Sequence, residues 1–159
     1  VYRDALPQLC DPALKGLLRV ALLDAGADSG TLAEQENAGA AMLDRVLSDS
    51  WARWMLSPER VERRAELALT HCTELGVDQL ILDYCFVDEA RGERWVVDYK
   101  TSAPLEGQSQ EQFMLAQLDH YAPQLTAYAK ALGARFAEPV RCALYFPALG
   151  KHAQWSPGS

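Results

Sequence analysis

The sequence predicts an α/β fold, in which a β-sheet is flanked by helices and follows a helical N-terminal segment. Two β-rich apolar runs, residues 80–87 and 95–99, are joined by a short polar segment, which is typical of a β-hairpin. Residues 111–132 then form the strongest helical pattern in the chain, and residues 140–146 form a closing apolar run. The length of 159 residues and the 49% hydrophobic content fit one domain with a real core.

The first 60 residues are predicted to be helical. In a helix over residues 12–24, apolar side chains recur at the spacing of one helix face, namely Leu14, Leu17, Leu18, Ala21 and Leu22. A second helix is expected over residues 31–54, with a buried stripe made of Ala40, Leu43, Val46 and Leu47. We therefore expect a helical segment over residues 1–60 packed on the core, the core itself over residues 61–155, and a tail over residues 156–159.

Two further strands and a bent helix complete the expected fold. Alternating apolar and polar residues over 63–75 predict a strand that leads into the hairpin, and residues 152–155 predict an edge strand. Pro123 falls inside the long helix, where a proline removes a main-chain hydrogen bond and usually produces a kink. We expect this bend to orient Tyr121 and Gln124.

Both hairpin strands carry an acid inside an apolar run, Asp83 in the first and Asp98 in the second, and Lys100 follows two residues later. If the turn is centred between Ala90 and Arg91, paired positions add up to 181 and the two aspartates lie opposite each other. Cross-strand partners bring their Cβ atoms to roughly 4.5–5.5 Å. Because side chains alternate along a strand, Lys100 shares the face of Asp98.

The expected surroundings of these charges are apolar, with Ile81, Cys85 and Val96 as neighbours. An uncompensated charge is costly there. A divalent cation would compensate two carboxylates, and Mg²⁺ is commonly held by one or two of them together with waters.

The same residues also allow a structural ion pair, in which the two aspartates bind Lys100 or Arg94. A turn shifted by one residue would place the aspartates on opposite faces of the sheet. The register of the hairpin therefore decides between a metal site and two separated acids.

An acid in one strand, a hairpin, and then Val-Val-Asp-Tyr-Lys-Thr-Ser resembles the motifs of the metal-dependent PD-(D/E)XK nuclease superfamily. More narrowly, the chain is similar to the RecB-type nuclease domain at the C-terminus of bacterial helicase-nucleases of the UvrD/Rep kind. Motif three of that family is Asp98-Tyr99-Lys100 here. The following helix matches Tyr-x-x-Gln-Leu-x-x-Tyr at residues 121–128, so the motifs span residues 66–128.

The resemblance implies a restriction-endonuclease-like core with a mixed central β-sheet. It also implies hydrolysis of DNA phosphodiesters, as an exonuclease in DNA repair and recombination. The implied cofactor is Mg²⁺, for which Mn²⁺ would substitute, with Asp83, Asp98 and the backbone carbonyl of Tyr99 as ligands. Glu66 matches the position of a further family acid, and it is either an additional metal partner or a solvated strand acid.

The remaining site residues are assigned roles by the same resemblance. Lys100 would orient the attacking water or stabilise charge in the transition state. Gln124 would touch a nucleotide or hold that water, which makes it a candidate catalytic residue beside the two aspartates and Lys100. Tyr121 and Tyr128 would contact phosphate or stack on a base, and the alternative is that they are core residues of the helix.

Composition limits the cofactors and partners. The four cysteines, Cys10, Cys72, Cys85 and Cys142, lack the short spacing of a zinc or iron–sulfur site, so no iron–sulfur cluster is expected. Residues 149–151 lack the pattern of a Walker loop, so no ATP site is expected in this chain. The net charge of −7 disfavours a free-standing DNA binder. The resemblance implies helicase motor domains in the same parent protein or complex that would hold the DNA.

One family feature is missing from the predicted N-terminal helices. Family members often carry a metal-binding histidine there, whereas this chain has only His71, His120 and His152. The chain begins with Val1, which indicates an excised piece, so the histidine either precedes it or is not needed. This departure favours a second hypothesis, a degenerate nuclease fold that binds DNA ends or docks a protein. No apolar stretch of about 18 residues and no secretory leader is seen, so we expect a cytoplasmic protein without membrane insertion.

Overall fold

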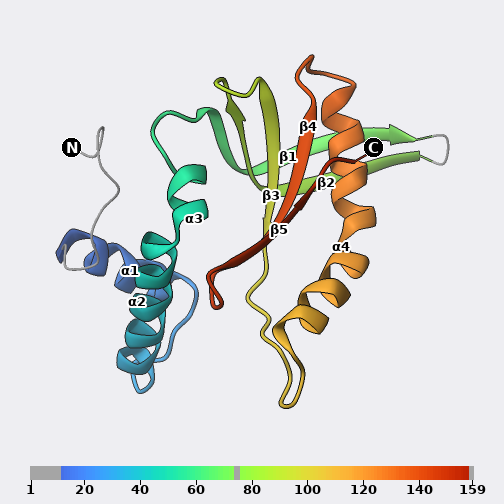
Figure 1. Cartoon of the computed structure of the whole chain (residues 1–159). Coiled ribbons are helices and arrows are strands. Elements are labelled where there is room, and N and C mark those ends of the chain that lie inside the picture. Colours follow the sequence, from blue (N-terminus) through green and yellow to red (C-terminus); the bar gives the residue numbers. More distant parts are fainter. Residues whose placement is uncertain (1–11, 74–75, 158–159) are drawn as a thin grey trace. The chain divides into compact units, whose positions relative to one another are not determined.

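The computed structural model describes residues 12–73 and 76–157 of the chain (Figure 1). Contacts divide these residues into two compact units. One unit contains the residues up to Pro58 together with Pro147–Gly150, and the other contains Glu59–Phe146 and the residues from Lys151 on. The first unit is helical, and the second contains the sheet. Among the described residues, no helix has the length and apolar character needed to cross a bilayer.

The helical unit consists, in its described part, of α1 (Pro12–Asp24), α2 (Leu32–Ser48) and α3 (Ser50–Met55). The predicted bounds of the first helix are confirmed. The prediction of one helix over residues 31–54 was wrong, because the backbone is extended at Asp49, with φ −77° and ψ 124°. The Asp49 carboxylate accepts hydrogen bonds from the main-chain N–H groups of Trp51 and Ala52, at 3.3 and 3.2 Å, and so caps α3.

The contact between α1 and α2 uses a narrow stripe of side chains. Three leucines of α1 at i, i+4 spacing are partly buried, namely Leu14, Leu18 and Leu22. Leu17 is 65% exposed and Ala21 is exposed as well, so the apolar face predicted for this helix is only partly covered. A Cβ atom on Gly39 of α2 would lie 3.0 Å from Cδ1 of Leu18. Glycine at this position therefore lets the two helices approach closely along the Leu18 side.

The sheet contains five strands in the order β1 (Val61–Thr73), β2 (Gly76–Asp88), β3 (Glu93–Tyr99), β4 (Val140–Phe146) and β5 (Lys151–Trp155). Neighbouring strands are antiparallel except for β3 and β4, which are parallel. Parallel neighbours need a long crossover, and α4 (Gln110–Gly133) supplies it. The sheet is therefore mixed, as the family resemblance implies, and α4 contacts β3 and β4.

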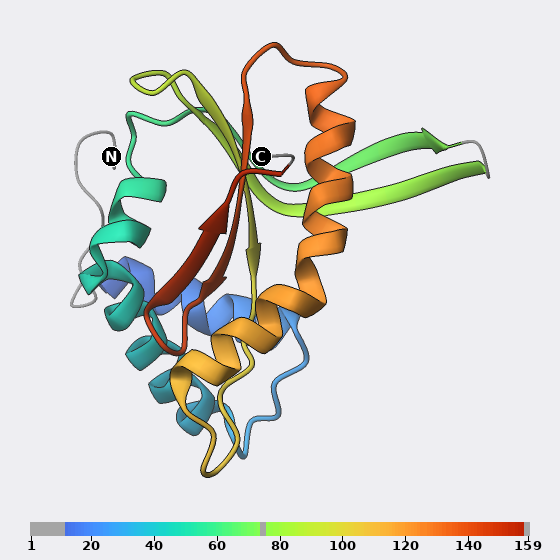
Figure 2. The ribbon, with the colours of Figure 1, turned by 45° about the vertical axis from the view of Figure 1, so that its right-hand side comes forward.

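One face of the sheet packs against α4. The helix buries a stripe of side chains at helical spacing, with Leu125, Tyr128 and Leu132 each 5% exposed or less. Opposite them, the thiol of Cys142 in β4 donates to the carbonyl of Leu125 at 3.4 Å. Burial raises the pKa of Cys142 to about 12. Figure 2 shows α4 changing direction part-way along its length, and Pro123 lies inside it.

The hairpin turn between β2 and β3 is fixed by a buried acid and a glycine. Asp88 is 1% exposed and forms ion pairs with Arg60 and Arg91. The main-chain N–H of Arg91 donates to the carbonyl of Asp88 at 3.2 Å, which closes the turn. Gly92 follows with φ +63°. This backbone conformation is unfavourable for residues that carry a Cβ atom, so glycine is preferred here. These constraints set where β3 starts and hence the register of the hairpin.

Replacing Gly92 with alanine is expected to lower the free energy of unfolding by about 1 kcal/mol through backbone strain. No atom lies within 4 Å of a Cβ at this position, so the cost is conformational and not steric. Gly133→Ala is the matched control, because that helical glycine also has open space and lacks a positive φ. The control should gain roughly 0.5–1 kcal/mol. Urea denaturation of the three proteins measures both changes, and equal effects at the two sites would contradict the turn assignment.

Candidate active site

The register predicted for the hairpin is confirmed. The Cα partners of β2 and β3 run from Tyr84 with Val97 to Asp88 with Glu93, and every pair adds up to 181. Asp83 and Asp98 stand one position beyond the last of these pairs, at the end of the ladder. Positions in register point to the same face of a sheet, so both aspartates belong to the face on which α4 packs.

The main chain of β3 binds the side chain of Asp83 at this point. The N–H of Lys100 donates to the carbonyl of Tyr145 in β4 at 2.9 Å, so the N–H of Tyr99, one residue earlier, is directed to β2. It donates to Oδ2 of Asp83 at 2.8 Å. A carboxylate oxygen thus takes the place of a main-chain acceptor where the ladder ends, which holds Asp83 beside β3.

Asp98 lies deeper than Asp83 and has a cationic neighbour. Its residue is 4% exposed, and Nζ of Lys100 lies 2.6 Å from Oδ2 of Asp98. Lys100 is thus an ion-pair partner of the buried Oδ2 atom, for which no hydrogen bond is found among the described residues. Burial raises the pKa of Asp98, Lys100 partly offsets this, and the nearby charge of Asp83 raises that pKa further.

Helix α4 brings aromatic and amide side chains to the same region. Nζ of Lys100 lies 3.8 Å from the centroid of the Tyr121 ring, and the ring of His120 packs edge-on against Tyr121 with centroids 4.5 Å apart. One turn further along, Nε2 of Gln124 donates to the hydroxyl of Tyr128 at 2.5 Å. Gln124 is exposed, whereas Tyr128 is 5% exposed.

A family model, the PD-(D/E)XK nuclease superfamily, matches residues 3–154, which is nearly the whole chain. The chain belongs to the PD-(D/E)XK nuclease superfamily. No curated protein matches the chain. The fold agrees with this assignment, since a five-stranded mixed sheet with α4 packed against it is consistent with a restriction-endonuclease-like core.

Membership of the PD-(D/E)XK superfamily suggests a divalent metal, because its nucleases generally use one. Asp83 and Asp98 fit such an ion by their chemistry. They are hard oxygen donors on neighbouring strands, and Asp98 has a buried oxygen without a hydrogen bond and a pKa raised by burial. A carboxylate in this condition is stabilised by a cation, and Mg²⁺ needs few protein ligands because it keeps several waters.

Glu66 stands opposite Asp83 in the register of β1 and β2, but it does not join Asp83 and Asp98 in a three-residue metal group among the described residues. The pairs on either side of it, Ala65 with Tyr84 and Leu67 with Leu82, place it opposite Asp83. Its backbone has φ +51° and its side chain is exposed. Over residues 12–73 and 76–157, no three His, Cys, Asp or Glu side chains converge in a way that could hold a metal ion.

The surroundings of the site are less apolar than predicted. Cys85 and Val96 are buried, at 1% and 0% exposed, but Ile81 is 61% exposed, so its prediction as part of an apolar enclosure was wrong. The β2–β3 ladder stops at Tyr84, and β3 therefore does not cover Ile81. The side of the site towards Ile81 is therefore open to solvent.

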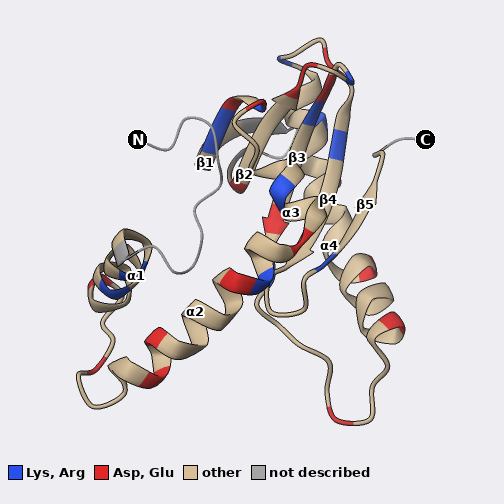
Figure 3. Ribbon diagram, turned by 60° about the vertical axis from the view of Figure 1, so that its left-hand side comes forward, with Lys and Arg blue, Asp and Glu red and all other residues tan. Residues whose placement is uncertain are grey.

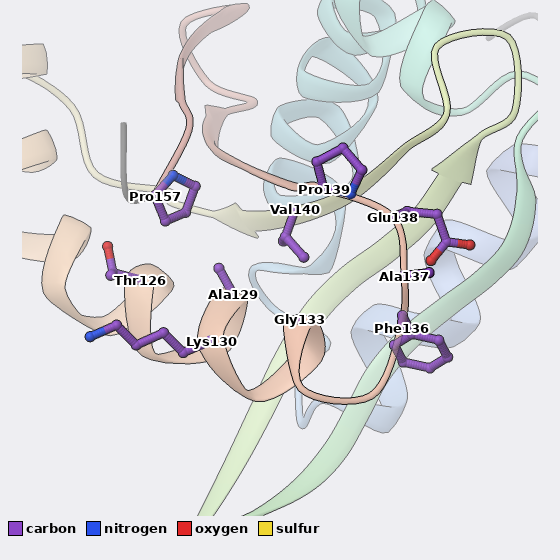
Figure 4. A pocket seen from close by; sticks show the side chains of 10 residues that line it. All are labelled: Thr126, Ala129, Lys130, Gly133, Phe136, Ala137, Glu138, Pro139, Val140 and Pro157. Carbon is purple, nitrogen blue, oxygen red and sulfur yellow. The ribbon is translucent and has the colours of Figure 1, made fainter.

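A separate hollow of about 530 Å³ lies along the C-terminal half of α4 (Figure 4). Its lining residues are Thr126, Ala129, Lys130, Gly133, Phe136, Ala137, Glu138, Pro139, Val140 and Pro157. Asp83, Asp98 and Lys100 are not among its lining residues. The carboxyl of Glu138, which does line it, lies 3.4 Å from the guanidinium of Arg94. It lacks the paired carboxylates that phosphodiester hydrolysis needs, so the strand-end aspartates and not this hollow form the candidate active site.

Asp98→Asn is expected to change how stability depends on pH in metal-free buffer. Since folding raises the pKa of Asp98, the folded wild type binds more protons than the unfolded chain. The ionisation of Asp98 therefore lowers the free energy of unfolding as pH rises from the ordinary pKa of aspartate through its raised pKa in the folded state. The variant lacks this loss. Its free energy of unfolding relative to wild type should increase as pH rises from about 4, the ordinary aspartate pKa, towards neutral.

Urea denaturation over that range, with EDTA present, measures the difference. Asp119→Asn, at an exposed carboxylate of α4, is the control and should show no such trend. A difference between Asp98→Asn and wild type that stays level or shrinks with rising pH would contradict the burial of an unfavourable charge at Asp98.

Proposed function

We propose that this chain is a metal-dependent deoxyribonuclease domain that hydrolyses DNA phosphodiesters, acting as an exonuclease within a helicase-nuclease of DNA repair and recombination. The observation that supports this most strongly is the meeting of Asp83, Asp98 and Lys100 at the open end of the β2–β3 ladder. Family membership supports the nuclease class, and the residues of the site support the chemistry.

The proposed metal ligands are Asp83, Asp98 and the main-chain carbonyl of Tyr99. The N–H and C=O groups of one strand residue leave towards the same neighbouring strand, and the N–H of Tyr99 reaches Asp83. The carbonyl of Tyr99 therefore leaves β3 on the side of Asp83. These groups would hold a divalent ion, Mg²⁺ or Mn²⁺ in its place, which would supply a bound water of lowered pKa and neutralise charge on the phosphate.

Lys100 is proposed to act on the reacting groups directly. Its side chain is 20% exposed, so it is largely sheltered from bulk water yet accessible to a phosphate or a nucleophilic water. A fixed positive charge in a sheltered site stabilises the negative charge that develops during hydrolysis. Gln124, exposed and bound to the hydroxyl of Tyr128, is proposed to contact the nucleotide. Tyr121 lies beside Lys100, whereas Tyr128 belongs to the buried stripe of α4.

The charge of the chain indicates that DNA is held mainly elsewhere. The net charge is −7, and Figure 3 shows acidic residues along both α2 and α4. Tight DNA binding uses many Lys and Arg contacts to phosphates. We therefore propose that helicase motor domains of the same parent protein or complex supply most of the DNA affinity.

Substituting the site should remove cleavage without unfolding the domain. In the intact protein with Mg²⁺, Asp83→Asn, Asp98→Asn and Lys100→Met are each expected to lower the rate of cleavage of a labelled DNA at least about 100-fold. Asp119→Asn is the control on α4 and should cleave at the wild-type rate. Circular dichroism confirms folding of each variant, and retained Mg²⁺-dependent cleavage by Asp98→Asn would refute the assignment.

A second candidate function is a degenerate nuclease fold that binds DNA ends or docks another protein. The acidic composition and the lack of a third converging ligand among the described residues favour it. Such a module has no need of a metal, so Mn²⁺ calorimetry separates the two functions. We expect the wild type to bind Mn²⁺ and the affinity of Asp98→Asn to fall at least about tenfold. Wild-type protein that shows no heat of binding would support the docking module.

A further inference from the structure

The side chain of Lys100 is held from two sides. Its ammonium lies 2.6 Å from Oδ2 of Asp98 and 3.8 Å from the centroid of the Tyr121 ring. Lys100 itself follows the last residue of β3, and its main-chain N–H is bound to the carbonyl of Tyr145 at 2.9 Å. The backbone is thus fixed, but a lysine side chain has a flexible four-carbon stem. The two neighbours of the ammonium decide where its charge rests.

The Tyr121 ring stands on a well-anchored part of α4. Leu125 and Tyr128 follow on the same helix face, one and two turns later, and they are 0% and 5% exposed. The ring of His120 packs edge-on against Tyr121, with centroids 4.5 Å apart. An aromatic face carries negative charge density that attracts an ammonium group. The ring is therefore a fixed electrostatic support for Lys100.

We propose that Tyr121 is a positioning residue, whose ring face and not its hydroxyl fixes the Lys100 ammonium for phosphodiester hydrolysis. Asp98 cannot do this alone, because a carboxylate that contributes to a metal site shares its charge with the cation. A neutral ring does not compete with a metal ion for the carboxylate of Asp98. It therefore holds the ammonium whether or not Asp98 binds a metal ion. The catalytic part of this inference rests on the proposed function.

The geometry can be tested without activity. Protons that lie over an aromatic face are shifted upfield, so the ε-methylene resonances of Lys100 should stand apart from those of the other three lysines, Lys15, Lys130 and Lys151. Lysine-labelled protein in metal-free buffer gives this spectrum, and Lys100→Arg assigns the signal. The shift should persist in Tyr121→Phe and vanish in Tyr121→Leu. An unshifted Lys100 signal in the wild type would overturn the proposal, whatever the variants do.

Kinetics then separate three roles for Tyr121. If the ring positions Lys100, Tyr121→Leu should lower kcat by roughly 3- to 30-fold with KM nearly unchanged, and Tyr121→Phe should recover most of the loss. A phosphate contact by the hydroxyl would instead raise KM in Tyr121→Phe. Stacking on a base would raise KM in Tyr121→Leu alone. Either KM pattern would overturn the proposal.

The controls keep the proposed function and this inference apart. Leu115→Ala changes a 57% exposed side chain of the same helix and should alter neither the lysine spectrum nor kcat. Wild-type protein that fails to cleave DNA with Mg²⁺ would refute the proposed function and the catalytic part of the inference. Loss of the upfield signal in Tyr121→Leu would still support the ring contact in that case.

Discussion

The site depends on one hydrogen bond, from the N–H of Tyr99 to Oδ2 of Asp83. It occurs where β2 and β3 stop pairing, and it uses a side-chain acceptor in place of a main-chain one. The strand therefore keeps its donor satisfied while the sheet opens, which avoids the cost of an unpaired buried N–H. The same bond holds the carboxylate of Asp83 close enough for its charge to raise the pKa of Asp98.

The cost of this arrangement lies at Asp98. Burial disfavours its ionised form, and the neighbouring Lys100 offsets only part of that effect. Stability alone would favour an apolar residue at this position, because the positions beside it on the same face, Val96 in β3 and Leu144 in β4, are both fully buried. A buried carboxylate with a raised pKa at the open end of a sheet is a feature typical of functional sites.

Much of this could be predicted from the sequence, because the decisive features are local. The turn that contains Gly92 sets the register of the hairpin, and the register brings the two aspartates together. The bounds of α1 and β4 likewise follow from the local pattern of apolar residues. The break at Asp49 was missed because a capping aspartate inside an apolar pattern resembles a helical residue. The contact of Tyr121 with Lys100 lay beyond reach, since it depends on how α4 crosses the sheet.

Charge links the site to the acidic chain around it. Two carboxylates and one ammonium leave the site with a net negative charge, and DNA phosphate is negative as well. Neither the site nor the chain, at −7, attracts the substrate by its own electrostatics. Under the proposed function, a bound divalent cation would reverse the sign of the charge at the reacting centre only, and the domain would gain affinity for phosphate at that centre. The acidic charge therefore agrees with the proposal that other domains or partners hold the DNA while this domain acts on it.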